Sequence, residues 1–348
     1  MSHPAVTVLM PVYNGERYVA RAVKSILDQS FRDFEFLVIN DGSTDRSSDI
    51  IREFGDPRIR VIDTENQGVA AALRLGMKEA RGAYIARMDA DDECLPDRLE
   101  IEKHCLDEHP GISVVHGSVE YIDSEGSPIF MEMDEGYSNV VTKWLLNWRN
   151  VLIHSTVMLR AAVLKEHGLN YRIELNRAED FDLWNRVARV GDFIYLPDVL
   201  IRYRIHSENV SNSSPVDLQF AAQSRVILDN FRRYGVEVPI ETAQELVVIS
   251  GAARINPITY CYKNLKGNMH SLVADISKNF CIAHTLETNV LAAIQARQYL
   301  RWARYMLNTS RSYTMRLLFL SLCKSKAVIF SYLFWAVMGG LLLPKKCN

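Results

Sequence analysis

The sequence contains few cysteines, and their positions do not pair them. Six cysteines occur in 348 residues, with no C-x-x-C pair and no spacing typical of metal ligands. This absence excludes a disulfide framework and a structural zinc site, so we expect reduced thiols in a cytosolic protein. The first residues lead directly into an apolar run, and we therefore expect no cleaved signal peptide.

Acidic residues are missing from the last part of the chain. No Asp or Glu occurs from residue 288 to the end, whereas nine of the 40 Lys and Arg residues lie there. The rest of the chain carries 31 basic and 42 acidic residues. An acidic body with a basic tail indicates an anionic surface as the partner of the tail. We expect no nucleic-acid partner.

A hydrophobic run long enough for a standard membrane span is also lacking. Residues 327–343 are 17 uncharged, largely apolar residues between lysines, and a spanning helix needs about 20. We therefore predict an interfacial or re-entrant anchor on anionic lipid. The protein would then be cytoplasmic, peripheral or monotopic on the inner face of the cytoplasmic membrane. The alternative is a terminal helix that packs on the protein itself or in an oligomer.

Apolar runs alternate with helical patterns in the first part of the chain. The runs at residues 6–10, 34–39, 59–62 and 83–87 are typical of buried strands, and amphipathic helical patterns separate them. This order predicts an α/β fold with a mainly parallel, doubly wound sheet flanked by helices. Because ligands of such sheets bind at the carboxyl ends of the strands, the site is expected there.

Polar segments follow three of these strands. Pro11 and Tyr13 end the first strand, Asp41 ends the second, and Asp89-Ala90-Asp91-Asp92 ends the fourth. Carboxylates so close together repel one another unless a cation lies among them. A divalent metal with a phosphate-bearing ligand would supply that cation. A solvated acidic turn that begins the next helix is the alternative.

Tyr13 and Asp41 each allow two interpretations. Tyr13 offers a flat face on which a nucleobase can stack, or it is a half-buried ring in a loop. Asp41 can accept a hydrogen bond from a base N–H, or it only accepts backbone hydrogen bonds within its own turn.

In combination, these segments resemble the family 2 glycosyltransferases with the GT-A fold. The resemblance lies in Pro11-Val12-Tyr13-Asn14, the segment from Val38 to Asp45, Asn66-Gln67-Gly68 and Asp89-Ala90-Asp91-Asp92. It implies a nucleotide-diphospho-sugar donor, with a UDP-sugar favoured, a Mg²⁺ or Mn²⁺ cofactor, and inversion at the anomeric carbon. It places Pro11, Tyr13, Asp41 and Asp89 at the donor nucleotide, with Asp89 near the ribose, and it makes Asp91 the metal ligand.

The resemblance continues at Glu179-Asp180, where the family has its catalytic base. Asp180 matches the base, because direct displacement requires a carboxylate that takes the proton of the acceptor hydroxyl. Glu179 and Asp182 are possible substitutes. Acidic residues also favour the first turn of any helix, because they complement its dipole. Trp184 either packs this helix or lies under the acceptor.

Two further segments carry candidate site residues. His154, in a predicted strand at residues 153–159, either lies near the acceptor or is a core histidine. Near residue 204 the sequence resembles a late motif of the family. The resemblance there implies that Arg204 and His206 reach the diphosphate and that His206 completes the metal site. Imidazole suits Mn²⁺ less well than oxygen does, so a surface histidine on a strand is the alternative.

These observations predict three parts of the chain: a GT-A catalytic domain at residues 1–217, a helical region at 218–308 and a membrane-associating tail at 309–348. The predicted activity is an inverting, metal-dependent transfer of one sugar to a saccharide acceptor. The tail indicates a lipid-linked acceptor in surface polysaccharide synthesis. The alternatives are a sugar-nucleotide nucleotidyltransferase, whose Gly-rich phosphate loop is missing, and an inactive binding module.

Overall fold

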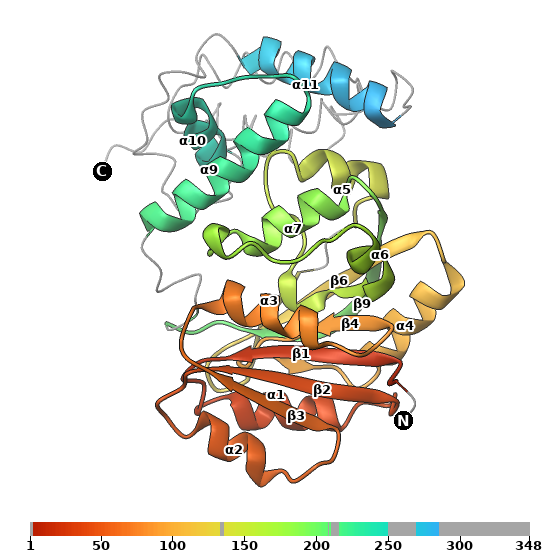
Figure 1. The fold of residues 1–348 in the computed structure, drawn as a ribbon, viewed down its shortest axis with the longest axis vertical. Coiled ribbons are helices and arrows are strands. Elements are labelled where there is room, and N and C mark those ends of the chain that lie inside the picture. The colour runs from red at the N-terminus through yellow and green to blue at the C-terminus, as the bar shows by residue number, and fades with distance from the viewer. Residues whose placement is uncertain (1–2, 133–135, 208, 210–215, 250–268, 285–348) are drawn as a thin grey trace. The chain divides into compact units, whose positions relative to one another are not determined.

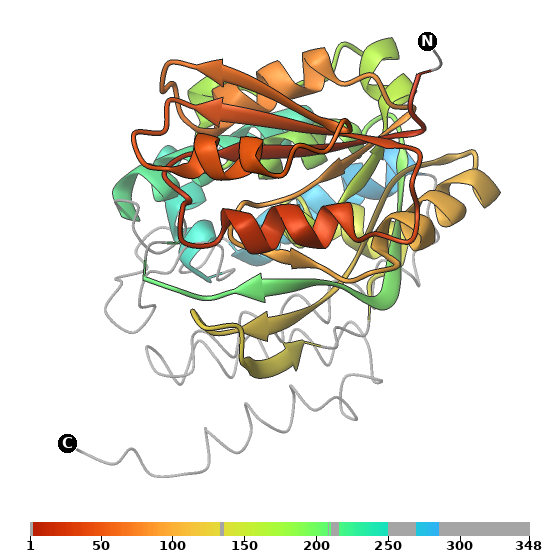
Figure 2. The same cartoon turned by 90° about the horizontal axis from the view of Figure 1, so that it is seen from below.

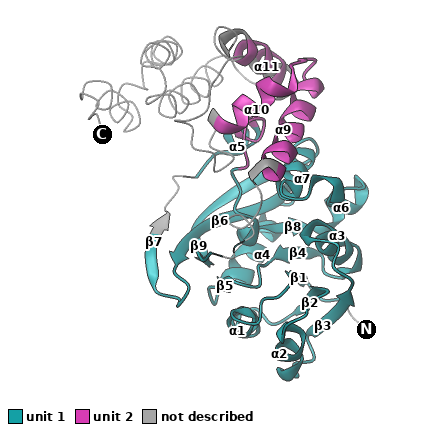
Figure 3. Ribbon diagram, turned by 90° about the vertical axis from the view of Figure 1, so that its left-hand side faces the viewer, with its two compact units in different colours: residues 1–143, 151–214 teal, residues 144–150, 215–348 magenta. Residues whose placement is uncertain are grey.

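A computed structural model of the protein describes residues 3–132, 136–207, 209, 216–249 and 269–284 (Figure 1). The chain forms two compact units, one of residues 1–143 and 151–214 and the other of residues 144–150 and 215–348 (Figure 3). The domain limits placed after residues 217 and 308 stay predictions. The predicted membrane-associating tail lies outside the described residues.

The first unit is built on a nine-stranded sheet in the order β3-β2-β1-β4-β8-β6-β9-β5, with β7 paired to β6. The strands are β1 (Val6–Val12), β2 (Phe34–Asp41), β3 (Ile59–Thr64), β4 (Tyr84–Arg87), β5 (Glu93–Cys94), β6 (Ile112–Ile122), β7 (Pro128–Glu132), β8 (Met158–Arg160) and β9 (Asp192–Arg204). Strands β1 to β4 pair in parallel, and β8 is inserted antiparallel between β4 and β6. The mainly parallel α/β sheet predicted from the sequence is confirmed.

Helices cover both faces of the parallel part of the sheet (Figures 1 and 2). The first unit contains α1 (Val19–Leu27), α2 (Ser47–Glu53), α3 (Val69–Glu79), α4 (Arg98–Glu108), α6 (Ala161–Glu166) and α7 (Glu179–Val187), and α5 (Asn139–Leu145) runs across its limit at residue 143. Helix α1 buries Val19, Val23 and Ile26 in the core that includes alternate residues of β1. Helix α3 lies so close to β1 that a Cβ on Gly76 would stand 2.1 Å from Leu9 Cδ1.

The predicted strand at residues 153–159 is wrong in its first half. A 3₁₀ turn occupies His154–Thr156, and only Met158–Arg160 forms strand β8. The Thr156 hydroxyl donates to the Ile153 carbonyl at 2.8 Å. Such a local side-chain bond offers the backbone an alternative to the ladder of a sheet, which explains the turn.

The second unit contains the helices α9 (Val216–Arg233), α10 (Ile240–Ile249) and α11 (Met269–His284) among its described residues. Its core includes an inserted segment from earlier in the chain. The Trp144 ring lies 5.2 Å from that of Phe280, and the Trp148 ring lies 5.2 Å from that of Phe231, both edge to face. Within the described ranges, no helix combines the length and the apolar character that crossing a membrane requires.

Candidate active site

The loops that follow β1 and β2 are tied to each other at the carboxyl edge of the sheet. The Asn14 side-chain oxygen accepts the Thr44 amide at 2.8 Å, and the Asn14 amide donates to the Ser43 hydroxyl at 3.1 Å. Asn14 adopts φ +48°, a conformation that Asn tolerates better than most residues. The neighbouring Tyr13 is 54% exposed.

The Asp41 carboxylate is buried and organises the Asn66-Gln67-Gly68 segment. One oxygen accepts the Gln67 amide at 2.9 Å, and the other accepts the Gly68 amide at 2.8 Å. Gly42 has φ +73°, and a Cβ there would lie 2.6 Å from the Asn66 nitrogen, so this position requires glycine. Oδ1 also accepts the Thr64 hydroxyl at 3.5 Å, so Oδ2 is the oxygen with a further lone pair. A hydrogen bond from Asp41 to a base stays a prediction.

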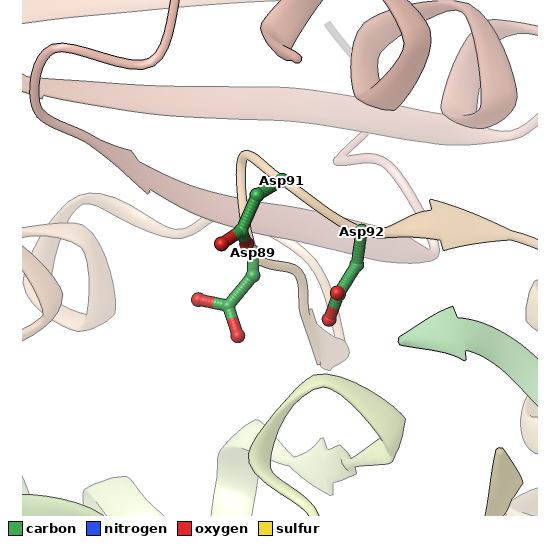
Figure 4. A group of neighbouring side chains, drawn as sticks. All are labelled: Asp89, Asp91 and Asp92. Atoms are coloured by element: carbon green, nitrogen blue, oxygen red, sulfur yellow. The ribbon is translucent and has the colours of Figure 1, made fainter. Parts of the chain in front are cut away.

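Asp89, Asp91 and Asp92 lie on the turn between β4 and β5, and their side chains extend to the same side of it (Figure 4). One potential ligand atom from each lies within 4.8 Å of those from the others. In the described part of the chain this is the one such group of three or more His, Cys, Asp or Glu side chains. The carboxylate cluster is therefore a candidate site for a divalent metal, whose charge would relieve the repulsion.

The protein itself neutralises part of the charge of this cluster. The buried Arg87 guanidinium, at the end of β4, forms an ion pair with Asp89. Burial raises the pKa of the Asp89 carboxyl, while the Arg87 charge opposes that rise. Burial and the two neighbouring carboxylates raise the pKa of Asp92 well above its usual value. A bound cation would reverse these shifts, because it favours the ionised forms.

Asp91 has two side-chain partners, both from the segment that follows β9. His206 Nε2 lies 2.9 Å from Asp91 Oδ2, and Asn209 Nδ2 donates to the same oxygen at 3.1 Å. The His206 ring lies 4.7 Å from the ring of Tyr18. The structure therefore brings together Asp91 and His206, the two residues that sequence analysis placed at the metal.

Arg204 contacts the turn that carries this cluster, and its side chain is completely buried. Its guanidinium donates to the Asp91 carbonyl at 2.8 Å and to the Asp123 carbonyl at 3.1 Å, and it forms an ion pair with Glu93. Its backbone amide donates to Asp92 Oδ1 at 2.9 Å. These contacts join the turn after β4 to the hairpin between β6 and β7. A contact between Arg204 and a diphosphate stays a prediction, and in this structure the side chain binds protein groups.

Two acidic residues begin α7. Asp180 is half-buried, and its Oδ1 accepts the Phe181 amide at 2.7 Å. Glu179 is 8% exposed, and its Oε2 accepts the Arg177 amide at 2.6 Å. Burial, together with the nearby Asp180 charge, raises the pKa of Glu179 to about 7.

His154, Tyr171 and Trp184 form a cluster of rings. His154 Nε2 lies 2.7 Å from the Tyr171 hydroxyl, and the His154 ring lies 5.7 Å from that of Trp184. Burial, with the Arg87 charge, lowers the pKa of His154 well below its usual value, so the ring is neutral. Trp184 is fully buried. These positions fit the core alternatives for both residues, and a contact with the acceptor stays a prediction.

Sequence analysis missed Arg87, Asn209 and Tyr18. Arg87 stands in an apolar strand, and a charge in such a position requires a buried partner. The sequence alone could therefore have indicated Arg87. Asn209 and Tyr18 carry no comparable signal, because their partners, Asp91 and His206, are more than 100 residues away.

Several known proteins are similar to this chain in sequence. The family described as Glycosyl transferase family 2 matches residues 7–168. An uncharacterized glycosyltransferase of Haemophilus influenzae is 31% identical over 227 residues, covering 60% of this chain and 68% of that protein. An uncharacterized glycosyltransferase of Rickettsia typhi is 30% identical over 253 residues, covering 72% and 76%. The chondroitin synthase of Escherichia coli is 29% identical over 240 residues, which are 67% of this chain and 34% of the synthase.

Solved structures show the same fold. The crystal structure of residues 1–349 of S. aureus TarS in complex with UDP-GlcNAc has a TM-score of 0.57 at 16% identity, covering 90% of this chain and 89% of that one. The architecture is that of a GT-A glycosyltransferase. The chain belongs to glycosyl transferase family 2, and it is a glycosyltransferase.

Proposed function

We propose that this glycosyltransferase moves one sugar from a nucleotide-diphospho-sugar to a saccharide acceptor, with inversion and with a divalent metal. The carboxylate cluster at the end of β4, together with His206, carries this proposal. Its oxygen-rich donor set suits Mg²⁺ or Mn²⁺. TarS, which shares the fold, is solved with UDP-GlcNAc and with UDP, which supports a UDP-sugar as donor.

The nucleotide would occupy the carboxyl edge of β1 and β2. The exposed Tyr13 would stack on the base, next to Pro11, and Asp41 would accept a base N–H at Oδ2, which also accepts the Gly68 amide. Asp89 would lie near the ribose. Asp91 and His206 would hold the metal, which would neutralise the charge that develops on the departing diphosphate.

Asp180 would take the proton of the acceptor hydroxyl. It is half-buried at the start of α7, so its carboxylate is within reach of a ligand. Glu179 is buried, and its carboxyl oxygen accepts a backbone amide. This difference in access supports Asp180 over Glu179 as the base.

Donor consumption tests the proposal. Wild-type protein and Asp91→Asn would be incubated with UDP-, GDP- and dTDP-sugars, with Mn²⁺, with Mg²⁺ or with chelator. We expect release of one nucleotide that requires the metal and is lost in Asp91→Asn. The control is Asp49→Asn, which removes an exposed carboxylate on α2. If chelator leaves turnover unchanged, the metal is not required. If no donor is bound or consumed, the transferase proposal fails.

The acceptor is proposed to be lipid-linked, and this part depends on the basic tail from residue 309. Protein truncated before Thr309 should leave the membrane fraction and still hydrolyse donor, because the proposed donor site lies within the first unit. Recovery of the full-length protein in the soluble fraction at physiological salt would contradict membrane association.

A further inference from the structure

The backbone is strained immediately before the helix that carries Asp180. Arg177 adopts φ +84°, in the left-handed region that residues other than glycine avoid. Among the described residues, the only other non-glycine residue with a positive φ is Asn14. Asn and Asp are enriched in this region, and Arg is not. Such a conformation persists only where surrounding contacts hold it.

The Ala178 amide donates to the Leu175 carbonyl at 2.8 Å, which closes a β-turn with Arg177 at its third position. A second contact on this turn comes from Glu179. Its Oε2 accepts the Arg177 amide at 2.6 Å, and the side chain is withdrawn from solvent. The N-cap residue of α7, Ala178, has no side-chain oxygen and makes no capping bond. Glu179 therefore reaches back across the helix start and adds a side-chain contact to the turn that leads into it.

Both flanks of this turn are anchored by other residues. On one side, the Asn176 amide group packs against Gly68, where an added Cβ would lie 3.3 Å from Asn176 Nδ2. On the other side, Arg186 pairs with Asp182 at 2.6 Å and donates to the Asn170 carbonyl at 2.6 Å. The left-handed residue lies between these anchored segments and connects them at the first turn of α7.

We propose that Glu179 is a positioning residue that holds the left-handed turn at Arg177 and thereby places Asp180. This inference rests on the proposed function, in which Asp180 is the base. Glu179 acts here as a hydrogen-bond acceptor, so its negative charge is not required. An Asp180 displaced by about 1 Å would cost up to about 100-fold in rate.

Four variants separate this role from direct catalysis. Glu179→Ala loses the acceptor, so kcat should fall by about 10- to 100-fold while the donor KM stays within about twofold. Glu179→Gln keeps an oxygen that can accept the same amide, so kcat should stay within about threefold of wild type. Arg177→Gly should be close to wild type. The double variant Glu179→Ala, Arg177→Gly should recover most of the lost kcat, because glycine adopts φ +84° without strain.

Glu174→Ala is the matched control, because it removes an exposed glutamate from the same segment, five residues before Glu179. It should leave kcat and KM unchanged. Thermal unfolding of every variant shows whether it is folded at the assay temperature.

The inference is overturned if Glu179→Ala keeps the wild-type kcat, or if Glu179→Gln loses as much as Glu179→Ala, which would show that the charge itself acts. It is also overturned if Arg177→Gly does not restore the kcat of the Glu179→Ala variant.

A second measurement needs no turnover: the Arg177 amide should be protected from hydrogen exchange in wild type and Glu179→Gln and should lose protection in Glu179→Ala. Equal protection in all three contradicts the inference, whereas absent sugar transfer with this exchange pattern contradicts only the proposed function.

Discussion

The turn after β4 and the first turn of α7 both concentrate carboxylates, but they balance the charge differently. At the turn after β4, Asp89 pairs with the Arg87 guanidinium, and Asp91 contacts His206 and Asn209. At α7, Glu179 and Asp180 accept backbone amides. The carboxylates after β4 are thus balanced by cationic and amide side chains, whereas those of α7 are bound by backbone amides.

The largest effect is expected at α7. Asp180→Asn removes the proposed base and should lower kcat by about 10² to 10⁴. Donor KM and metal dependence should change little, because the proposed donor and metal residues lie at the ends of β1, β2, β4 and β9. Initial rates at saturating donor, with Asp49→Asn as the control, measure this. A wild-type rate in Asp180→Asn would transfer the role of the base to another carboxylate.

Arg87→Met tests the balance of charge at the turn after β4. It leaves Asp89 without its cation and should lower the free energy of unfolding by about 2–3 kcal/mol. This is less than the 3–5 kcal/mol lost when a fully buried pair is broken, because the Asp89 side chain is 29% exposed. Adding Asp89→Asn should restore part of the loss. Urea unfolding measures both, with the exposed Arg81→Met as control. Equal stability of Arg87→Met and wild type would contradict the pairing.

Arg204→Lys tests whether the structure of the turn after β4 depends on a planar donor that forms several hydrogen bonds. A single ammonium cannot serve the Asp91 and Asp123 carbonyls and Glu93 together. We expect a loss of about 1–3 kcal/mol in stability and a weaker apparent affinity for the metal. The exposed Arg202→Lys is the control. A change in donor KM alone would instead favour the predicted contact of Arg204 with the diphosphate.

A pH dependence is expected at Glu179, whose pKa is raised from 4.5 to about 7 by burial and by Asp180. A carboxyl with a raised folded pKa stabilises the fold most below its unfolded pKa, and this contribution is lost as pH rises through the folded value. Glutamine does not titrate. The unfolding free energy of Glu179→Gln relative to wild type should therefore rise between pH 4.5 and 7 and then level off.

Urea unfolding of both proteins across this range measures the difference. Asp180 and Arg87, whose charges act on the Glu179 carboxyl, are present in both proteins, so their own titration largely cancels. Glu174→Gln removes an exposed carboxyl and should show no such trend. A difference between Glu179→Gln and wild type that does not vary with pH would contradict the raised pKa.

Much of the fold followed from the pattern of apolar residues. Runs of apolar residues predicted β1, β2 and β4, because strands buried on both faces cannot alternate with polar residues. A similar run predicted the half-buried edge strand β3. The His154 region misled the same reasoning, since a local Thr156 hydrogen bond favoured a turn over a strand. The site was predicted in part. The acidic turn after β4 was visible as a motif, but its cation Arg87 and its partner Asn209 were not recognised.

The sequence by itself determined which residues could carry the chemistry, because the polar segments directly follow strands and parallel strand ends share one edge. Only the tertiary structure decided how each of them is used. Arg204 reaches the Asp91 carbonyl across 113 residues, and Asp41 binds the Gly68 amide across 27. Glu179 acquires its raised pKa through burial. Burial and long-range hydrogen bonds depend on packing between distant segments, and spacing along the chain does not specify them.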